Sequence, residues 1–269
     1  MGPRVAPRVD VAATMAELLK RDRAVVLASL LSIVVLAWGY ILHLAAGMNG
    51  MPVGALEADL HTWTTMEFVV MFFMWTVMMI AMMLPSATPM LLVFSSVARN
   101  RRDTRSPISA TGAFLLGYFA LWTVFSLLAT VAQLMLHSAA LLSAHMSSVS
   151  PILSGVLLLV AGVYQFTPLK NACLSRCRTP LGFLLTEWRD GLSGAFHMGI
   201  RHGLFCIGCC WLLMALLFVA GVMSILWIAV LAIVVLAEKA MTSGEAIGRA
   251  IGVCAIGWGF WLLGVNLGS

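Results

Sequence analysis

Charged residues are scarce in this chain of 269 residues: they make up 10% of it, whereas 61% of the residues are hydrophobic. A soluble surface needs roughly 25–35% charged residues, so this composition excludes a soluble globular protein. It also excludes an intrinsically disordered chain, which would be poor in hydrophobic residues. Six cysteines spread over this length exclude a small scaffold stapled by disulfides. The remaining class is a membrane protein.

Several functional signatures are also absent. The chain has no phosphate-binding loop, no His-Glu-x-x-His zinc helix and no recognisable Ser/His/Asp set. No platform of basic and aromatic residues indicates nucleic-acid binding. The net charge of +5 is explained instead by basic loops that meet anionic lipid head groups. We therefore expect the lipid bilayer as a partner rather than nucleic acid, and no reaction is predicted, so a non-enzymatic role is favoured.

Long apolar runs predict an all-α, polytopic transmembrane bundle of about seven helices. A helix needs about 20 apolar residues to cross a hydrocarbon core roughly 30 Å thick. The sixth run is the shortest, which leaves six spans with a re-entrant segment as the alternative. In the second run, Pro85 and Pro89 predict a kink or break near its end. The runs are 24–46, 68–98, 108–136, 151–168, 196–220, 225–237 and 247–267.

The positions of lysine and arginine predict the orientation of the chain. If seven spans alternate, every basic residue falls on one side, and the first loop on the other side, 47–65, carries only Glu57 and Asp59 as charged groups. Because cytoplasmic loops are enriched in Lys and Arg, we expect a cytoplasmic N-terminus and a location in the bacterial cell (inner) membrane. The expected organisation is a basic cytoplasmic tail, 1–23, followed by a single multi-pass transmembrane domain, 24–269.

Sulfur-containing residues are the second unusual feature. Eight of the 18 methionines lie between Met66 and Met90. At about 100° per residue, several side chains of the second predicted helix fall on one stripe. The members of this stripe are Glu67, Met71, Met74, Met78 and Met82. Met79 and Met83 lie on a neighbouring face. Methionine is also an adaptable packing residue, so the stripe alone does not separate a binding site from a core.

The fifth predicted helix carries three thiols within five residues. His202, Cys206 and Cys210 repeat every four residues, and Cys209 lies one turn from Cys206, so these side chains share one side of the helix. Clustering at helical spacing favours metal binding, with redox chemistry and packing as the alternatives. The Cys-x-x-Cys-Cys spacing is less specific than a four-cysteine zinc motif.

The softness of these ligands indicates which metal would bind. Thiolates and thioethers together select Cu(I), whereas magnesium and calcium require oxygen ligands, which the predicted spans lack. We therefore predict a copper site, in the Cu(I) state, between the second and fifth helices. The predicted ligands are Cys206, Cys209, Cys210, His202, Met74, Met78, Met82, Met71 and Glu67.

Residues on both flanks could extend this site into a path. On the predicted cytoplasmic side, Cys173 and Cys177 lie four apart in a basic loop and are either further ligands or two reduced thiols. There, Glu238 and Lys239 are interpreted as the end of a helix. The candidates on the outer side are Met48, Met51, Glu57, Asp59, His61, Met66, Glu67, His137, His145 and Met146.

These motifs resemble a bacterial family of predicted metal-binding integral membrane proteins, which is defined by a domain of unknown function. The resemblance covers roughly residues 67–240 and lacks the Cys173/Cys177 pair. It implies a multi-pass topology and metal binding through the methionine and cysteine motifs, and it implies no assigned reaction. The segments that carry it are 75–87, the Arg-His-Gly-x-x-Cys-x-Gly-Cys-Cys motif of 201–211, Gly221-x-Met223 and Glu238-Lys239.

Three functions are compatible with the sequence. The leading hypothesis is that the protein binds Cu(I) in the membrane and transports it or delivers it to a copper-accepting protein. The second is an accessory subunit of a larger membrane copper enzyme complex, an oxygenase or oxidase. The third is a membrane thiol oxidoreductase that uses the pairs Cys206/Cys209 and Cys173/Cys177. No thiol lies on the predicted outer face, where such oxidation usually takes place, and this argues against the third.

Overall fold

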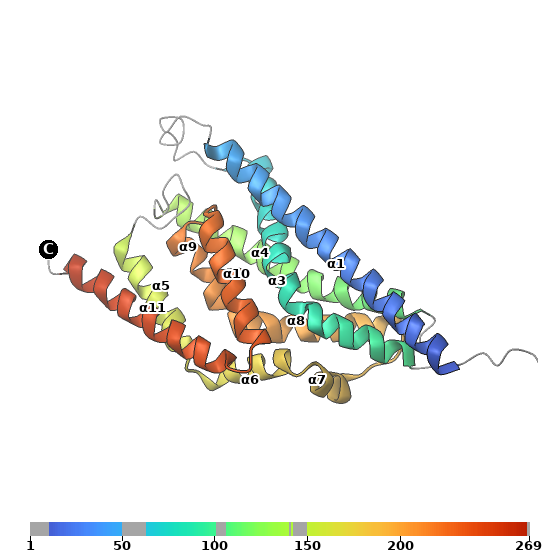
Figure 1. Cartoon of the computed structure of the whole chain (residues 1–269). Helices are drawn as coiled ribbons and strands as arrows, with labels where there is room; N and C mark the ends of the chain where they lie inside the picture. The colour runs from blue at the N-terminus through green and yellow to red at the C-terminus, as the bar shows by residue number, and fades with distance from the viewer. Residues whose placement is uncertain (1–10, 50–62, 101–105, 140, 142–149, 268–269) are drawn as a thin grey trace, which may run out of the picture.

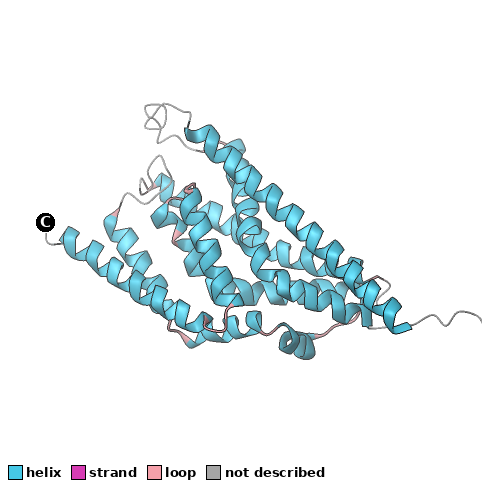
Figure 2. Cartoon of the chain, viewed as in Figure 1, coloured by secondary structure: helices cyan, strands magenta, loops and turns pink. Residues whose placement is uncertain are grey.

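A computed structural model describes residues 11–49, 63–100, 106–139, 141 and 150–267 (Figure 1). Every regular element in these ranges is a helix, and they contain no strand (Figure 2). The all-α prediction is therefore confirmed. The helix α1 begins at Val11, so much of the segment expected as a basic tail, 1–23, already belongs to the first helix.

Long helices occupy all seven positions expected from the apolar runs. They are α1 (Val11–Asn49), α3 (Thr65–Asn100), α4 (Pro107–Ser138), α5 (Pro151–Tyr164), α8 (Gly191–Ala215), α10 (Ile225–Ala240) and α11 (Gly244–Leu267). Three short helices lie between them: α6 (Pro168–Arg178), α7 (Pro180–Glu187) and α9 (Leu217–Ala220).

Length and composition support five or six crossings rather than seven. Five helices are long and apolar enough to cross a membrane, and a sixth crossing arises if α5 and α6, bent by 64°, form one span. The helix α10 has 16 residues, which extend only about 24 Å at 1.5 Å per residue. The structure therefore lies closer to the six-span alternative, as the shortness of the sixth apolar run suggests.

Proline defines where several helices begin. It occupies the first turn of α4, α5, α6 and α7, where its missing N–H removes no hydrogen bond. Within α3, by contrast, Pro85 and Pro89 lie inside a continuous helix, so they do not break it as the sequence allowed. Figure 1 shows that α3 changes direction along its length, in keeping with the expected kink.

The core of the bundle forms around α3, α4, α8 and α10, with α1 packed along α3 and α11 packed against α5 (Figure 1). Two glycines bring α4 and α8 into backbone contact. A Cβ on Gly199 would overlap the Phe114 carbonyl, and one on Gly117 would overlap the Phe196 carbonyl. This close approach fixes α8, the helix with the three thiols, against α4.

Candidate metal site

Sulfur atoms of α3 and α8 meet at one point inside the bundle. Cys210 Sγ lies 3.9 Å from Met83 Sδ, and the exposed fractions of the two residues are 1% and 0%. The remaining thiols of α8, Cys206 and Cys209, belong to the same buried cluster as Met79 and Met82. The second and fifth expected helices are therefore in contact through soft side chains.

Polar groups surround Cys206, which lies one turn before Cys210. Its Sγ is 3.1 Å from the Tyr118 hydroxyl of α4 and accepts a hydrogen bond of 2.9 Å from Lys239 Nζ of α10. Lys239 also donates to Ser86 Oγ of α3 at 3.1 Å. A thiol, a phenol, a hydroxyl and a buried ammonium group from four helices thus converge beside the Cys210–Met83 contact.

The three thiols of α8 face three different neighbours. Cys206 contacts α10, Cys210 contacts α3, and Cys209 lies in the same buried cluster as Cys177 of α6, the helix that packs against α8. Cys209 and Cys210 each donate a hydrogen bond of 3.0 Å to the Cys206 carbonyl. The prediction that they share one side of the helix holds, but their environments differ.

The predicted methionines of α3 lie at several levels of the bundle. Met74 and Met78 line a small void of about 10 Å³ together with Met223, which leaves room for about one water molecule. Met82 is fully buried in the main core. Met71 lies nearer the start of the helix, where its Sδ accepts a hydrogen bond of 3.9 Å from Gln133 Nε2.

His202 and Glu67, the two predicted ligands without sulfur, lie among aromatic rings and at a helix start, respectively. The His202 ring lies among Phe114, Tyr118 and Phe183, with ring centroids 5.6–5.9 Å apart, and no group in the described ranges hydrogen-bonds its Nδ1. Glu67 caps the start of α3, where its Oε2 accepts hydrogen bonds from the Thr64 backbone N–H and hydroxyl at 2.7 and 2.9 Å. Their roles as ligands stay predictions.

Most of the outer-side candidates lie outside the described residues. The side chain of Met48 is not described, and the other candidates outside the described residues are Met51, Glu57, Asp59, His61, His145 and Met146. Met66 is 71% exposed, and the His137 ring packs 5.6 Å from that of Trp63.

The sequence patterns predict no role at the site for Lys239, Ser86 or Tyr118. Glu238 and Lys239 are expected at the end of a helix, and α10 does end at Ala240, but their exposed fractions are only 1% and 8%. An ionisable pair adjoining an apolar helix is itself a signal of function. The place of these two residues in the family motif is a second signal.

The chemistry of the converging donors fits a soft metal. In the part of the chain that the structure describes, no group of three or more His, Cys, Asp or Glu side chains is arranged to hold a metal ion. The donors that meet are instead the Cys210 thiol and the Met83 thioether, and Cys206, one helical turn before Cys210, lies in the same buried cluster. Such a mixed sulfur set suits Cu(I) better than harder cations.

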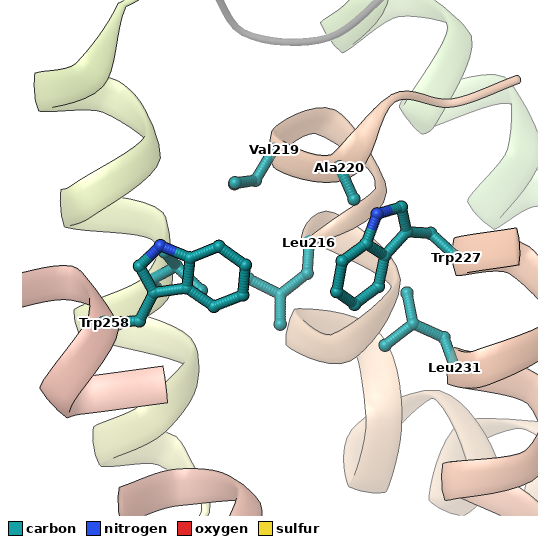
Figure 3. A pocket seen from close by; sticks show the side chains of 7 residues that line it. Leu216, Val219, Ala220, Trp227, Leu231 and Trp258 are labelled. Atoms are coloured by element: carbon teal, nitrogen blue, oxygen red, sulfur yellow. The ribbon is translucent and has the colours of Figure 1, made fainter. Parts of the chain in front are cut away.

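A second cavity, of about 260 Å³, has a different character (Figure 3). Its walls come from α5, α9, α10, α11 and Leu216, which joins α8 to α9, and are apolar, with Trp227 and Trp258 facing each other at a centroid distance of 6.3 Å. No thiol, thioether, imidazole or carboxylate lines it, so we do not place the metal site there.

The fold and the site define a class of protein: a helical bundle with several helices apolar enough to cross a membrane and with thiol and thioether side chains buried between them. A family model described as "PpoB2: Copper chaperone" matches residues 72–262. Because this match covers most of the chain, the protein belongs to that family. The predicted copper-related role is thereby supported. No curated protein and no solved structure gives a match.

Proposed function

We propose that this protein is a multi-pass protein of the bacterial cell (inner) membrane that binds Cu(I) through sulfur ligands and passes it to a copper-accepting protein. The observation that carries the proposal is the contact of 3.9 Å between Cys210 Sγ and Met83 Sδ. It joins the cysteine motif to the methionine-rich helix in a buried position. The family membership supports the choice of copper.

The separation of the two sulfurs suits a shared ion. Metal–thiolate bonds of about 2.3 Å allow two sulfurs on one metal to lie up to roughly 4.6 Å apart, and 3.9 Å falls within this range. Cys206 lies one turn away on the same helix and is the natural third ligand. Cys206, Cys210 and Met83 therefore form the central site of the proposal.

Lys239 supplies charge compensation at this site. Two thiolates that bind one Cu(I) ion leave a net negative charge, which would be costly in a buried environment without a partner. The Lys239 ammonium group already lies 2.9 Å from Cys206 Sγ. We assign it the role of stabilising the charge of the loaded site from a position beside the ligands.

The void lined by Met74, Met78 and Met223 provides a second station for the ion. Met78 precedes Met83 by five residues on α3, a rise of about 7.5 Å along the helix. Soft ligands at successive depths allow an ion to exchange stepwise, provided that each site binds strongly enough for entry and weakly enough for exit. In the proposed orientation this station lies on the outer side of the central site.

Copper analysis of the purified full-length protein tests the proposal. Protein in detergent is loaded anaerobically with Cu(I), freed of excess metal and measured for bound copper. We expect the triple variant Cys206→Ser, Cys209→Ser, Cys210→Ser to lose most of its copper, and Met83→Leu to lose part of it. The controls are Cys254→Ser and Met241→Leu, since both residues are exposed. Unchanged copper in the triple variant would refute the proposal.

A further inference from the structure

The two cysteines of α6 form a separate feature that the central site does not include. Four residues apart, Cys173 and Cys177 lie on one face of this helix, and α6 packs against α8. Cys173 is partly exposed, whereas Cys177 is buried at 9% exposure and Cys209 at 1%. The thiols of α6 and α8 are thus ordered by depth, from the surface towards the centre of the bundle.

Contacts place both α6 thiols on one short stretch of α8. Cys177 and Cys209 belong to the same buried cluster, where α6 packs against α8. Cys173 lies directly over Gly208, since a Cβ at Gly208 would come within 2.6 Å of Cys173 Sγ. The Gly208 carbonyl also accepts a hydrogen bond of 2.5 Å from the Tyr164 hydroxyl. The absence of a side chain at Gly208 therefore lets Cys173 reach the thiol cluster.

An ion pair holds α6 in this position. Lys170, three residues before Cys173, is 1% exposed and lies 2.8 Å from both carboxylate oxygens of Glu238 on α10. Lys170 also donates to Gln165 Oε1. The thiols of α6 are therefore presented to α8 by a helix that is anchored to a third helix.

We propose that Cys173 and Cys177 form a loading site through which Cu(I) passes between the basic side of the protein and Cys209. This inference rests on the proposed function and extends it to two cysteines that are not among the motifs of the family resemblance. The transfer is a ligand exchange without redox chemistry. The bond from Cu(I) to Cys173 breaks as a bond to Cys209 forms, and the proton of the Cys209 thiol passes to the Cys173 thiolate. Cys177 keeps its bond during the exchange.

The rate at which copper loads from the basic side tests this role. Inverted bacterial membrane vesicles, with the predicted cytoplasmic face outward, receive Cu(I)–glutathione, and copper is measured over time in protein re-purified from them. Because thiolates are the metal ligands, we expect Cys173→Ser and Cys177→Ser to load roughly tenfold more slowly than the wild type and to reach the same final copper content. The exposed Cys254→Ser variant should load like the wild type.

Other outcomes overturn the inference. Loading at the wild-type rate would show that the pair takes no part in transfer. A lower final copper content would show that the pair belongs to the central site instead. Failure of the proposed function gives a different result from failure of the loading role. In that case a variant lacking Cys206 and Cys210 would reach the copper content of the wild type. A copper-free measurement adds to this: a water-soluble maleimide should label Cys173 from outside inverted vesicles, and labelling confined to right-side-out vesicles would contradict the assigned side.

Discussion

Two buried lysines lie close together in this bundle and have different partners. Lys170 of α6 is paired with a carboxylate, that of Glu238, at 2.8 Å. Lys239, the residue after Glu238 on α10, instead donates hydrogen bonds to the Cys206 thiol and the Ser86 hydroxyl. The exposed fractions of Lys170 and Lys239 are 1% and 8%.

Under the proposed function, this difference separates a structural charge, that of Lys170, from a functional one, that of Lys239. A buried ion needs a partner, because its loss of hydration is otherwise uncompensated. Lys170 has this partner within the protein, the carboxylate of Glu238, so its charge needs no bound ligand to compensate it. The positive charge of Lys239 faces the Cys206 thiol, which in the proposed site becomes negative when it binds Cu(I) as a thiolate. Stability should therefore depend on Lys170, and copper affinity on Lys239.

The largest effect is expected from Lys170→Met. This change leaves Glu238 buried without its cation, and breaking a buried pair in this way costs about 3–5 kcal/mol in the free energy of unfolding. Thermal unfolding of the purified protein in detergent measures the loss. The double variant Lys170→Met, Glu238→Gln removes both charges and should recover most of the stability. A single variant as stable as the wild type would show that the pair is not structural.

The second effect concerns copper. We expect Lys239→Met to weaken Cu(I) binding by about 10–100-fold, the usual range for groups that support metal ligands, because the loaded thiolates lose their nearby cation. Competition with a Cu(I) chelator gives the affinity. The unfolding temperature of the metal-free variant should change less than that of Lys170→Met. An unchanged affinity combined with a large loss of stability would reverse the assignment of the two lysines.

A smaller effect is expected from Ser86→Ala. The substitution removes one of the two hydrogen-bond partners of Lys239, at 3.1 Å, and a hydrogen bond contributes about 0.5–1.5 kcal/mol net. Copper affinity should fall less than in Lys239→Met, since the contact with Cys206 remains. The same chelator competition measures the change, and a loss equal to that of Lys239→Met would show that Ser86 fixes the position of the ammonium group.

The smallest effect should come from an exposed ion pair. Arg249 and Glu245 lie 3.7 Å apart on α11, with side chains 60% and 51% exposed. Because water screens such pairs, Arg249→Ala should change the free energy of unfolding by about 1 kcal/mol or less. Thermal unfolding under the conditions used for Lys170→Met provides the comparison. A loss as large as that of Lys170→Met would mean that burial does not distinguish the two pairs.

The sequence predicts the helices well because their signal is local. Apolar runs place each long helix, and the spacing of Cys206 and Cys210 correctly puts both thiols on one side of α8. The contact of Cys210 with Met83, rather than with a member of the methionine stripe, depends on the rotation and depth of α3 against α8. Those two quantities arise from packing between helices that are far apart in the chain.

The buried lysines are a second example of contacts between distant helices that the sequence does not predict. Basic residues at helix ends are expected to mark the cytoplasmic side, and Lys170 and Lys239 fit that pattern in the sequence. The structure buries both of them, because each finds a partner on another helix: Glu238 of α10 for Lys170 and Cys206 of α8 for Lys239. A single sequence shows which residues are present at a helix end but not which of them face inward.

The adjacency of Glu238 and Lys239 has a mechanical consequence. One turn of α10 is bound through Glu238 to α6 and through Lys239 to α3 and α8. If α10 slid or rotated, the ion pair and the contact with Cys206 would be disturbed together, so the register of α10 against three other helices is fixed at one place. Copper would then have to be accommodated by the rotation of side chains within a fixed frame. A substitution at Glu238 should therefore loosen the attachment of α6. Cys173 on that helix should then react faster with thiol reagents, although the sequence of α6 is unchanged.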